Sequence, residues 1–447
     1  MPVDSLDAWL ATDVGGLGLA RAQELGPAAT VALVESSGLR GRGGAGFPTG
    51  RKWAGIADQR DAVRYVVANG AEGEPGTFKD RALLRANPYQ LVEGLIIAAF
   101  AVGAREAFIC VKERFDRERA GLVRAVQEMQ ASGICADCRL TIVGGPDEYL
   151  FGEEKAMLEV IEGNDPLPRW LPPYLHGLHA AEPQLGWQAH AGGTGANPTL
   201  VNNVETLSNV PHILARGAEW FRSRGTPRSP GTLVATVVGD VRSPGVDEVD
   251  LGTTLRSVID HVGGGVEPGR SVKVVFPGVA NAVVTADDRD VPLTYESFEA
   301  IGSGMGSAGF IVYDDRTCMV DAAYRLSRFL SIESCGQCPP CKLGGSAITE
   351  HLERIELGVG TPDDLDAIVG WLPRVADGNR CFLAVEEQQL ITSVLAAFEP
   401  EFHEHLATGR CPRPRRLPIP KLVDLADGVV TYDERFWHKR PDWTYDD

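Results

Sequence analysis

Three cysteines stand three residues apart in the stretch Glu333-Ser334-Cys335-Gly336-Gln337-Cys338-Pro339-Pro340-Cys341, and Cys381 follows between segments of helical spacing. The short loops between the three cysteines turn their thiolates toward one metal centre, and a remote fourth thiolate closes the shell. Iron–sulfur clusters of the four-iron type take four such thiolates. Zinc also accepts four thiolates, but structural zinc usually takes two separated C-x-x-C pairs. The pattern therefore favours a 4Fe-4S cluster on Cys335, Cys338, Cys341 and Cys381.

The residues around these cysteines have helical periodicity. Val320, Ala323 and Leu326 share one face, and Thr361-Pro362-Asp363-Asp364 has the capping residue, proline and acids of a helix start. Helices that carry cluster ligands at their ends form a small bundle. We expect a helical 4Fe-4S domain over residues 316–410.

The residues before the bundle predict a small α+β module that resembles a β-grasp fold, over residues 229–315. It combines strands, a turn and one helix, at Leu233–Val238, Val246–Val249, Thr254–Val262 and Val272–Phe276.

Residues 1–228 alternate between helical and strand patterns, which predicts an α/β layer domain. The predicted elements are Ala28–Ser37, Arg64–Ala68, Pro88–Val102, Ala107–Val111, Asp116–Ala131 and Leu140–Val143. The tail, residues 411–447, lacks strong periodicity, and we expect it to be an extended arm that lies on a neighbour.

The composition narrows the classes of function. The chain has 447 residues and a net charge of −18, so it lacks the basic surface that binding nucleic acid needs. Its longest apolar run, 94–104, is far shorter than the ~20 residues of a membrane span. Nine cysteines without an export signal predict reduced thiols in the cytoplasm, with peripheral attachment to the inner face of the membrane through partners left open.

A glycine-dense loop, Gly41–Gly50, precedes Lys52. Glycines let backbone amides approach a phosphate closely, and lysine supplies charge. The loop matches G-x-G-x-x-G, but a helix precedes it and Pro48 interrupts it, so we reject the dinucleotide fingerprint. A flexible surface loop remains an alternative.

Three further loops carry acids and amides, at Asn69–Gly76, Tyr149–Glu154 and Asn202–Thr206. The first follows a strand, where ligands bind in α/β sheets. Amides both donate and accept hydrogen bonds, as the edge of an isoalloxazine ring requires. Each loop alone could be solvated, but the four loops together favour a flavin nucleotide.

These segments resemble the flavin-bearing, NADH-oxidising (51-kilodalton type) subunit of respiratory complex I and its relatives in NAD-linked formate dehydrogenases and hydrogenases. The matching strings are 37–50, 72–81, 201–207 and 333–338, within a similarity over about residues 30–405. The resemblance implies FMN and a 4Fe-4S cluster as cofactors and NAD as substrate. It also implies hydride transfer to FMN, followed by single-electron transfer to the cluster and on to partner subunits.

The resemblance also implies roles for individual residues. Glu72 and Glu154 would be catalytic, Phe47 would stack on NADH rings, and Glu154 would line the NADH pocket. The cofactor-binding set would be Gly43, Gly44, Phe47, Lys52, Asn69, Glu72, Tyr149, Gly152, Glu153, Glu154, Asn202, Asn203 and Thr206. The implied partners are a thioredoxin-like 2Fe-2S subunit and a larger iron–sulfur or catalytic subunit.

The chain departs from the family pattern at Ala71, where a carboxylate normally contacts the flavin, at Gly55, where an adenine-stacking aromatic is missing, and at Leu171 and Lys155. These changes keep a second hypothesis open, in which an FMN and 4Fe-4S relay or scaffold subunit exchanges electrons with a partner other than NADH. The parent complex stays open as well.

The nine histidines show no metal spacing, and Cys135 and Cys138 form another C-x-x-C. We expect Cys135 and Cys138 to be loop cysteines without function, Cys318 to pack near the cluster, and His403 and His405 to lie on the surface.

Overall fold

The structure is a computed structural model that describes residues 2–60, 63–181, 195–415 and 417–446. The chain forms two compact units, each described by itself. The first comprises Met1–Gly73, Lys79–Val234 and Asp250–Gly252, and the second comprises Glu74–Phe78, Ala235–Val249 and Thr253–Asp447. The predicted domain boundaries at 228/229, 315/316 and 410/411 stay predictions.

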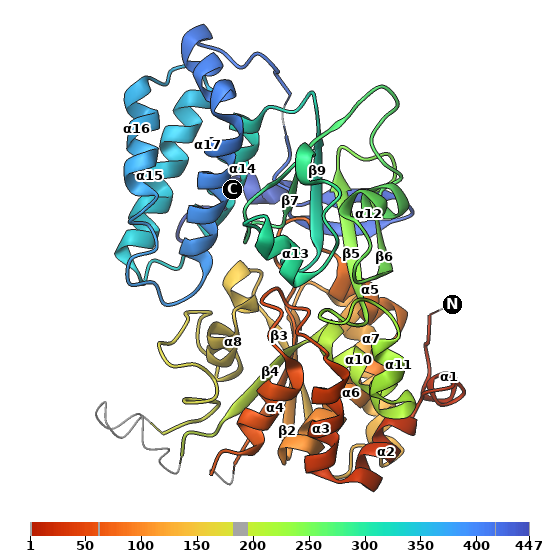
Figure 1. Cartoon of the computed structure of the whole chain (residues 1–447). Coiled ribbons are helices and arrows are strands. Elements are labelled where there is room, and N and C mark those ends of the chain that lie inside the picture. The colour runs from red at the N-terminus through yellow and green to blue at the C-terminus, as the bar shows by residue number, and fades with distance from the viewer. Residues whose placement is uncertain (1, 61–62, 182–194, 416, 447) are drawn as a thin grey trace. The chain divides into compact units, whose positions relative to one another are not determined.

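The first unit is built on a parallel sheet (Figure 1). Its strands are β1 (Tyr65–Gly70), β2 (Glu106–Lys112), β3 (Arg139–Gly145) and β4 (Thr199–Asn203), in the order β3-β2-β1-β4. The chain steps from β1 outward to β3, and β4 then pairs with the other side of β1. In open α/β sheets such a reversal leaves a crevice at the carboxyl ends of the strands, where ligands bind.

Helices cover both faces of this sheet. They are α1 (Leu6–Leu10), α2 (Leu17–Leu25), α3 (Pro27–Ser37), α4 (Thr49–Ala57), α5 (Lys79–Ala86), α6 (Pro88–Val102), α7 (Asp116–Ala131), η1 (Tyr149–Gly152), α8 (Glu154–Ile161), α10 (Val204–Arg216) and α11 (Ala218–Arg222). Within β1, Val66 and Ala68 join the core that contains α6 and α10, whereas Val67 joins the core that contains α8. Burial on both faces explains why the strands are apolar without alternation.

The second unit contains a sheet in the order β6-β5-β9-β7-β8. Its elements are β5 (Thr232–Gly239), β6 (Gly245–Asp250), α12 (Leu255–Val262), β7 (Val272–Pro277), β8 (Val284–Thr285), η2 (Ala286–Asp288), α13 (Tyr295–Ala300) and β9 (Gly309–Asp314). β9 pairs parallel with β5 and antiparallel with β7, which gives the mixed sheet expected of a β-grasp-like module.

A helical bundle follows in the same unit (Figure 1). Its helices are α14 (Met319–Glu333), α15 (Pro339–Glu356), α16 (Pro362–Trp371) and α17 (Leu383–Thr408). Thr361 and Asp364 form the capping box that starts α16, as the sequence predicted. Apolar residues of α14 and α15, such as Leu326, Phe329, Ile348 and Leu352, are fully buried. The mixed α/β, β-grasp-like and helical architecture is therefore confirmed.

The tail is not the extended arm that the sequence suggested. It forms the hairpin β10 (Leu422–Ala426) and β11 (Val429–Tyr432), followed by η3 (Glu434–His438). It folds back onto its own chain, because the Lys439 Nζ reaches Glu333 Oε1 at 2.9 Å with both side chains buried. The hairpin turns at Asp427 and Gly428, which both have positive φ, as the favoured two-residue turn requires.

Within the described residues, no helix combines the length and the apolar composition that crossing a bilayer requires.

Candidate functional site

The carboxyl ends of β1 and β4 bring Asn69 and Asn203 together as register partners. The amide of Asn69 donates to the Gly152 oxygen at 2.7 Å and accepts from the Ala71 N–H at 3.2 Å. Asn203 Oδ1 accepts from the Glu205 N–H at 2.9 Å, which caps α10. Both predicted site amides are therefore held in one orientation at the crevice.

A buried charge network, which the sequence did not reveal, lies behind Asn203. Lys79 Nζ lies 2.7 Å from Asp80 Oδ1, 2.9 Å from Glu205 Oε2 and 3.1 Å from Asn203 Oδ1. Burial alone would lower the pKa of Lys79, but the Asp80 and Glu205 carboxylates more than offset it, and the pKa is raised. Its sequence signal is the charged run Lys79-Asp80-Arg81, whose side chains are all buried.

The structure places Glu72 against the start of α5. One carboxylate oxygen accepts from the Asp80 N–H at 2.8 Å, and the other accepts from Arg81 Nε at 2.8 Å and from the Arg81 N–H at 3.2 Å. A carboxylate is favourable at a helix N-terminus because the helix dipole is positive there. Glu72 thus fixes the loop after β1, and its catalytic role stays a prediction.

The glycine loop is closed on itself. The Gly41 N–H donates to the Phe47 oxygen at 2.8 Å, and Arg40 Nε donates to the Gly46 oxygen at 2.7 Å. Gly44 and Gly46 have φ of 122° and 60°, which favours glycine. The preceding element is α3, a helix, which agrees with rejecting the dinucleotide fingerprint.

This loop packs against the start of α10. The Arg42 N–H donates to Thr206 Oγ1 at 2.9 Å. A Cβ added to Gly43 would lie 3.2 Å from Asn203 Cβ, so only glycine lets the backbone approach Asn203 this closely without a shift. The glycine backbone, two amides and a helix N-terminus form a cradle that suits a phosphate-bearing ligand.

The opposite wall of the crevice is the start of α8. Glu153 Oε2 accepts from the Lys155 and Ala156 N–H groups at 3.0 and 2.9 Å and caps the helix. Burial raises the pKa of Glu153 to about 7, although Lys155 acts in the opposite direction. The next residue, Glu154, pairs with Lys52 Nζ at 2.9 Å.

The other predicted residues lie on the same elements. Asn202 Oδ1 accepts from Trp53 Nε1 at 2.8 Å, which ties α4 to β4. Tyr149 lies on η1, and its Cα would be 3.5 Å from a Cβ on Gly73, in the loop after β1. Phe47, at the end of the glycine loop, leaves 53% of its surface exposed and so offers a ring face to a ligand.

In the second unit, three cysteines surround the turn from α14 to α15. Cys335 lies in the turn, Cys338 caps α15, and Cys341 lies in its first turn. Burial raises the pKa of Cys341 to about 11, and the charges of Cys335 and Cys338 add to this effect. Cys341 Sγ lies 3.2 Å from Ser334 Oγ, and Gln337 Nε2 donates to Cys335 Sγ at 3.7 Å, so hydrogen bonds within the turn orient two of the three thiols.

The bundle topology brings Cys381 toward the same end. Because α16 packs on α15 after a short connection, its carboxyl end returns toward the start of α15. Accordingly, a Cβ on Gly344 would lie 3.1 Å from Val375 Cγ2. Ser327 of α14 donates to Glu387 in the second turn of α17 at 2.6 Å. Three thiols and a fourth arriving at one end of a bundle are the donor set of a 4Fe-4S cluster.

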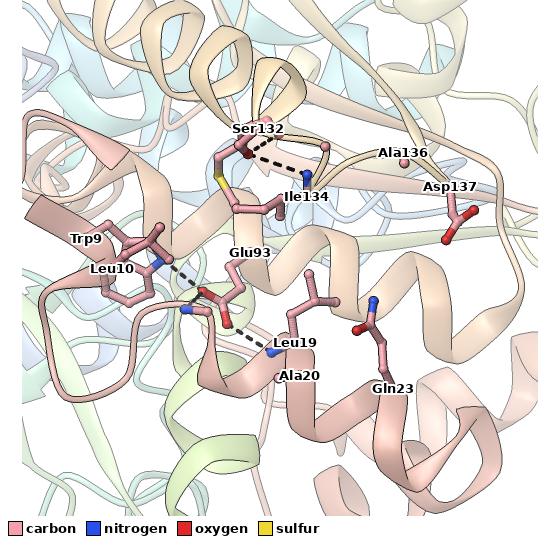
Figure 2. A pocket seen from close by; sticks show the side chains of 13 residues that line it. Trp9, Leu10, Leu19, Ala20, Gln23, Glu93, Ser132, Ile134, Ala136 and Asp137 are labelled. Carbon is pink, nitrogen blue, oxygen red and sulfur yellow. Dashed lines mark hydrogen bonds between the residues drawn. The ribbon is translucent and has the colours of Figure 1, made fainter. Parts of the chain in front are cut away.

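A pocket of about 380 Å³ lies elsewhere in the first unit, between α2, α6 and the end of α7 (Figure 2). Its buried acid, Glu93, accepts from Trp9 Nε1 at 2.8 Å and from the Gly16 and Leu19 N–H groups at 2.8 and 3.0 Å. The site residues predicted from the sequence are not among those that line it. Glu93 therefore serves to hold α1 and α2 on α6.

Fold and site together define a flavin- and iron–sulfur-binding protein of the α/β type, and comparisons with known proteins agree. Residues 34–212 match the Nuo51 FMN-binding domain, residues 234–277 an SLBB domain, and residues 321–405 the NADH-ubiquinone oxidoreductase-F iron–sulfur binding region.

Relatives match over nearly the whole chain. The NADH-quinone oxidoreductase F 2 subunit of Rhizobium meliloti is 38% identical, over 87% of this chain and 91% of its own. The HndC subunit of the NADP-reducing hydrogenase of Solidesulfovibrio fructosivorans is 35% identical, over 92% and 82%. The crystal structure of an NAD⁺-reducing [NiFe]-hydrogenase in the H2-reduced state matches with a TM-score of 0.78 and 31% identity, covering 91% of this chain and 67% of that one.

The chain therefore belongs to the family of the NADH-quinone oxidoreductase F subunit, and FMN and a 4Fe-4S cluster are its cofactors. The glycine cradle and the cysteine set fit these two groups. The family recognised from the sequence is confirmed.

Proposed function

We propose that the chain is the electron-entry subunit of a multisubunit oxidoreductase, accepting hydride from NADH in its first unit and passing electrons to the cluster in its second. The observation that carries the proposal is the junction of the carboxyl ends of β1 and β4, where Asn69 and Asn203 are register partners and the Gly41–Gly50 loop contacts the start of α10 through Arg42. Bound FMN supplies the chemistry, because it accepts a hydride and releases electrons one at a time.

Different residues at this end of the sheet would contact different parts of FMN. The glycine loop and the start of α10 would hold the phosphate, with charge from Lys52. The oriented amides of Asn69, Asn202 and Asn203 serve the ribityl chain and the ring edge. The supporting residues are Gly43, Gly44, Glu72, Tyr149, Gly152, Glu153 and Thr206.

NADH would enter beside the flavin, stack on Phe47 and meet Glu154. The Lys52–Glu154 ion pair is 30–38% exposed, so water screens it and a ligand can separate the two side chains at small cost. Lys52 would then turn to phosphate and Glu154 to the nicotinamide side.

A specific observation favours a second candidate. Ala71 is fully buried, and its Cβ would lie 3.9 Å from a Cβ on Gly152, where the family pattern has a carboxylate. A chain altered there, and at Leu171 and Lys155, could keep both cofactors and exchange electrons with a partner other than NADH.

Electrons would leave the first unit for a cluster held by Cys335, Cys338, Cys341 and Cys381. They would then pass to a thioredoxin-like 2Fe-2S subunit and a larger iron–sulfur or catalytic subunit in the cytoplasm, at the inner face of the membrane where the parent complex is membrane-bound.

Anaerobic stopped-flow mixing of the holoprotein with NADH separates the two candidates. Rapid bleaching of the flavin absorbance is the expected result. A flavin that stays oxidised while bound one per chain would reject NADH as donor and leave the relay function.

A further inference from the structure

A second group of metal-ligating side chains lies in the helical bundle, away from the cluster cysteines. Cys318, Glu356, His405 and Cys411 each present one ligand atom, and these four atoms lie within 4.8 Å of one another. Cys318 and His405 are buried, at 1% and 0% exposure. The sequence led us to expect His405 on the surface and Cys318 near the cluster, so both positions are corrections. His405 faces inward because it lies on the packed side of α17.

The distances among Cys318, Glu356 and His405 match three edges of a tetrahedral metal site. Cys318 Sγ lies 3.4 Å from His405 Nε2 and 3.7 Å from Glu356 Oε2, and His405 Nε2 lies 3.4 Å from Glu356 Oε2. Zinc bonds of about 2.0–2.3 Å at tetrahedral angles give edges of about 3.3–3.8 Å between ligand atoms.

The histidine is already oriented as a ligand. Its Nδ1 pairs with the Glu401 backbone oxygen at 2.7 Å, and a carbonyl oxygen only accepts, so Nδ1 carries the proton. In the neutral ring, Nε2 then keeps its lone pair for the centre of the group. A backbone carbonyl on the second ring nitrogen is the usual support of a metal-bound histidine.

From this geometry we infer that Cys318, Glu356, His405 and Cys411 bind one zinc ion. Two sulfurs, one nitrogen and one oxygen suit zinc, whereas calcium and magnesium require oxygen ligands and a 4Fe-4S cluster requires more thiolates. Four protein ligands leave no open position, which makes the site structural.

The zinc cross-links the helices and the tail at the end of the bundle opposite the cluster. Cys318 caps the start of α14, and Cys335 lies just beyond its end, about 22 Å away along a helix of 15 residues. Glu356 ends α15, His405 lies near the end of α17, and Cys411 begins the tail. The family's iron–sulfur region, 321–405, includes neither thiol of this site.

Metal analysis of the purified holoprotein tests the inference. Zinc should be present at about one per chain beside the cluster iron. Cys411→Ser should lose the zinc and keep iron and FMN, whereas the matched variant Cys335→Ser should lose iron and keep zinc. Two results would contradict the inference. One is a wild-type protein that contains no zinc although it was produced with added zinc. The other is a Cys411→Ser variant that retains all of its zinc.

X-ray absorption spectroscopy at the zinc edge tests the same site in the wild-type protein, so the result does not depend on whether a variant folds. Two sulfurs at about 2.3 Å with two lighter ligands at about 2.0–2.2 Å are expected. A shell of four sulfurs would place the zinc in the cluster site instead and contradict the inference. Glu356→Gln should weaken zinc retention against a chelator at least tenfold without changing iron content. No change would remove Glu356 from the ligand set.

Discussion

Asn203 at the end of β4 donates through Nδ2 to the backbone oxygen of Asn69 at the end of β1, at 3.4 Å, and to Asp80 Oδ2 at 2.8 Å. Its Oδ1 caps α10 at the same time. One side chain thus joins two neighbouring strands, a helix N-terminus and a buried ion pair at the reversal point of the sheet. The fold itself therefore orients the amides of the proposed flavin site.

Asn203→Ala should weaken FMN binding about tenfold, or roughly 1.4 kcal/mol, because it removes an oriented amide and a helix cap together. Quenching of FMN fluorescence on titration into the apoprotein measures the affinity. Asn209→Ala, six residues further along the chain in α10, removes a half-buried amide that donates to the Glu205 oxygen, and it should leave the affinity unchanged. Equal losses in both variants would mean that the effect is general to the helix.

Lys79→Met should destabilise the protein by roughly 3 to 5 kcal/mol, because it leaves the carboxylates of Asp80 and Glu205 buried without their cation. Urea unfolding followed by circular dichroism gives the change. Arg21→Met, which removes the exposed Arg21–Glu24 pair, should change stability by less than about 1 kcal/mol. A Lys79 variant as stable as the Arg21 variant would show that the network carries little energy.

Glu153 should make the apoprotein less stable as the pH rises from about 4.5 to about 7. Burial raises its pKa to about 7, so the folded chain holds a proton that the unfolded chain, with a pKa near 4.5, has already released. Folding therefore binds a proton in this window, and stability falls with rising pH. Glu153→Gln should gain stability relative to the wild type between pH 5 and pH 7.5, as measured by urea unfolding at both values. A difference independent of pH would contradict the raised pKa.

Cys381→Ser should abolish most of the 4Fe-4S signal in electron paramagnetic resonance while FMN content stays near one per chain. Three cysteines alone do not supply the four thiolates that the cluster takes. Cys135→Ser, in the buried C-x-x-C pair of the first unit, should keep both cofactors. A full cluster in the Cys381 variant would assign the fourth ligand to another residue.

Much of the fold could be predicted from local sequence patterns, such as helix-capping residues, prolines and glycines. The sequence predicted a helix over 88–102, and α6 has these bounds because Asn87 caps it, Pro88 starts it and Gly103 ends it in the left-handed region. α7 also has its predicted bounds, and Gly133, two residues beyond its end, has a positive φ. The sequence analysis missed the Asp427-Gly428 turn of the tail, a hairpin signal whose flanking strands are only five and four residues long.

The parts of the site that the sequence did not predict depend on contacts between residues that lie far apart in the chain. Nothing local to Lys79 shows that Glu205 will neutralise it, and nothing local to His405 shows which face of α17 packs inward. Cys318 and Cys411 lie so far apart in sequence that no motif spacing links them. Such groupings follow from helix packing, which the sequence pattern leaves undetermined.

The most direct test of the central claim is rapid-freeze electron paramagnetic resonance after mixing the protein with NADH, with and without bound FMN. We expect the cluster to be reduced in the FMN-loaded protein and to stay oxidised after FMN is removed, and returning FMN should restore the reduction. A cluster that NADH reduces equally well without FMN, or never reduces when both cofactors are bound, would contradict the account.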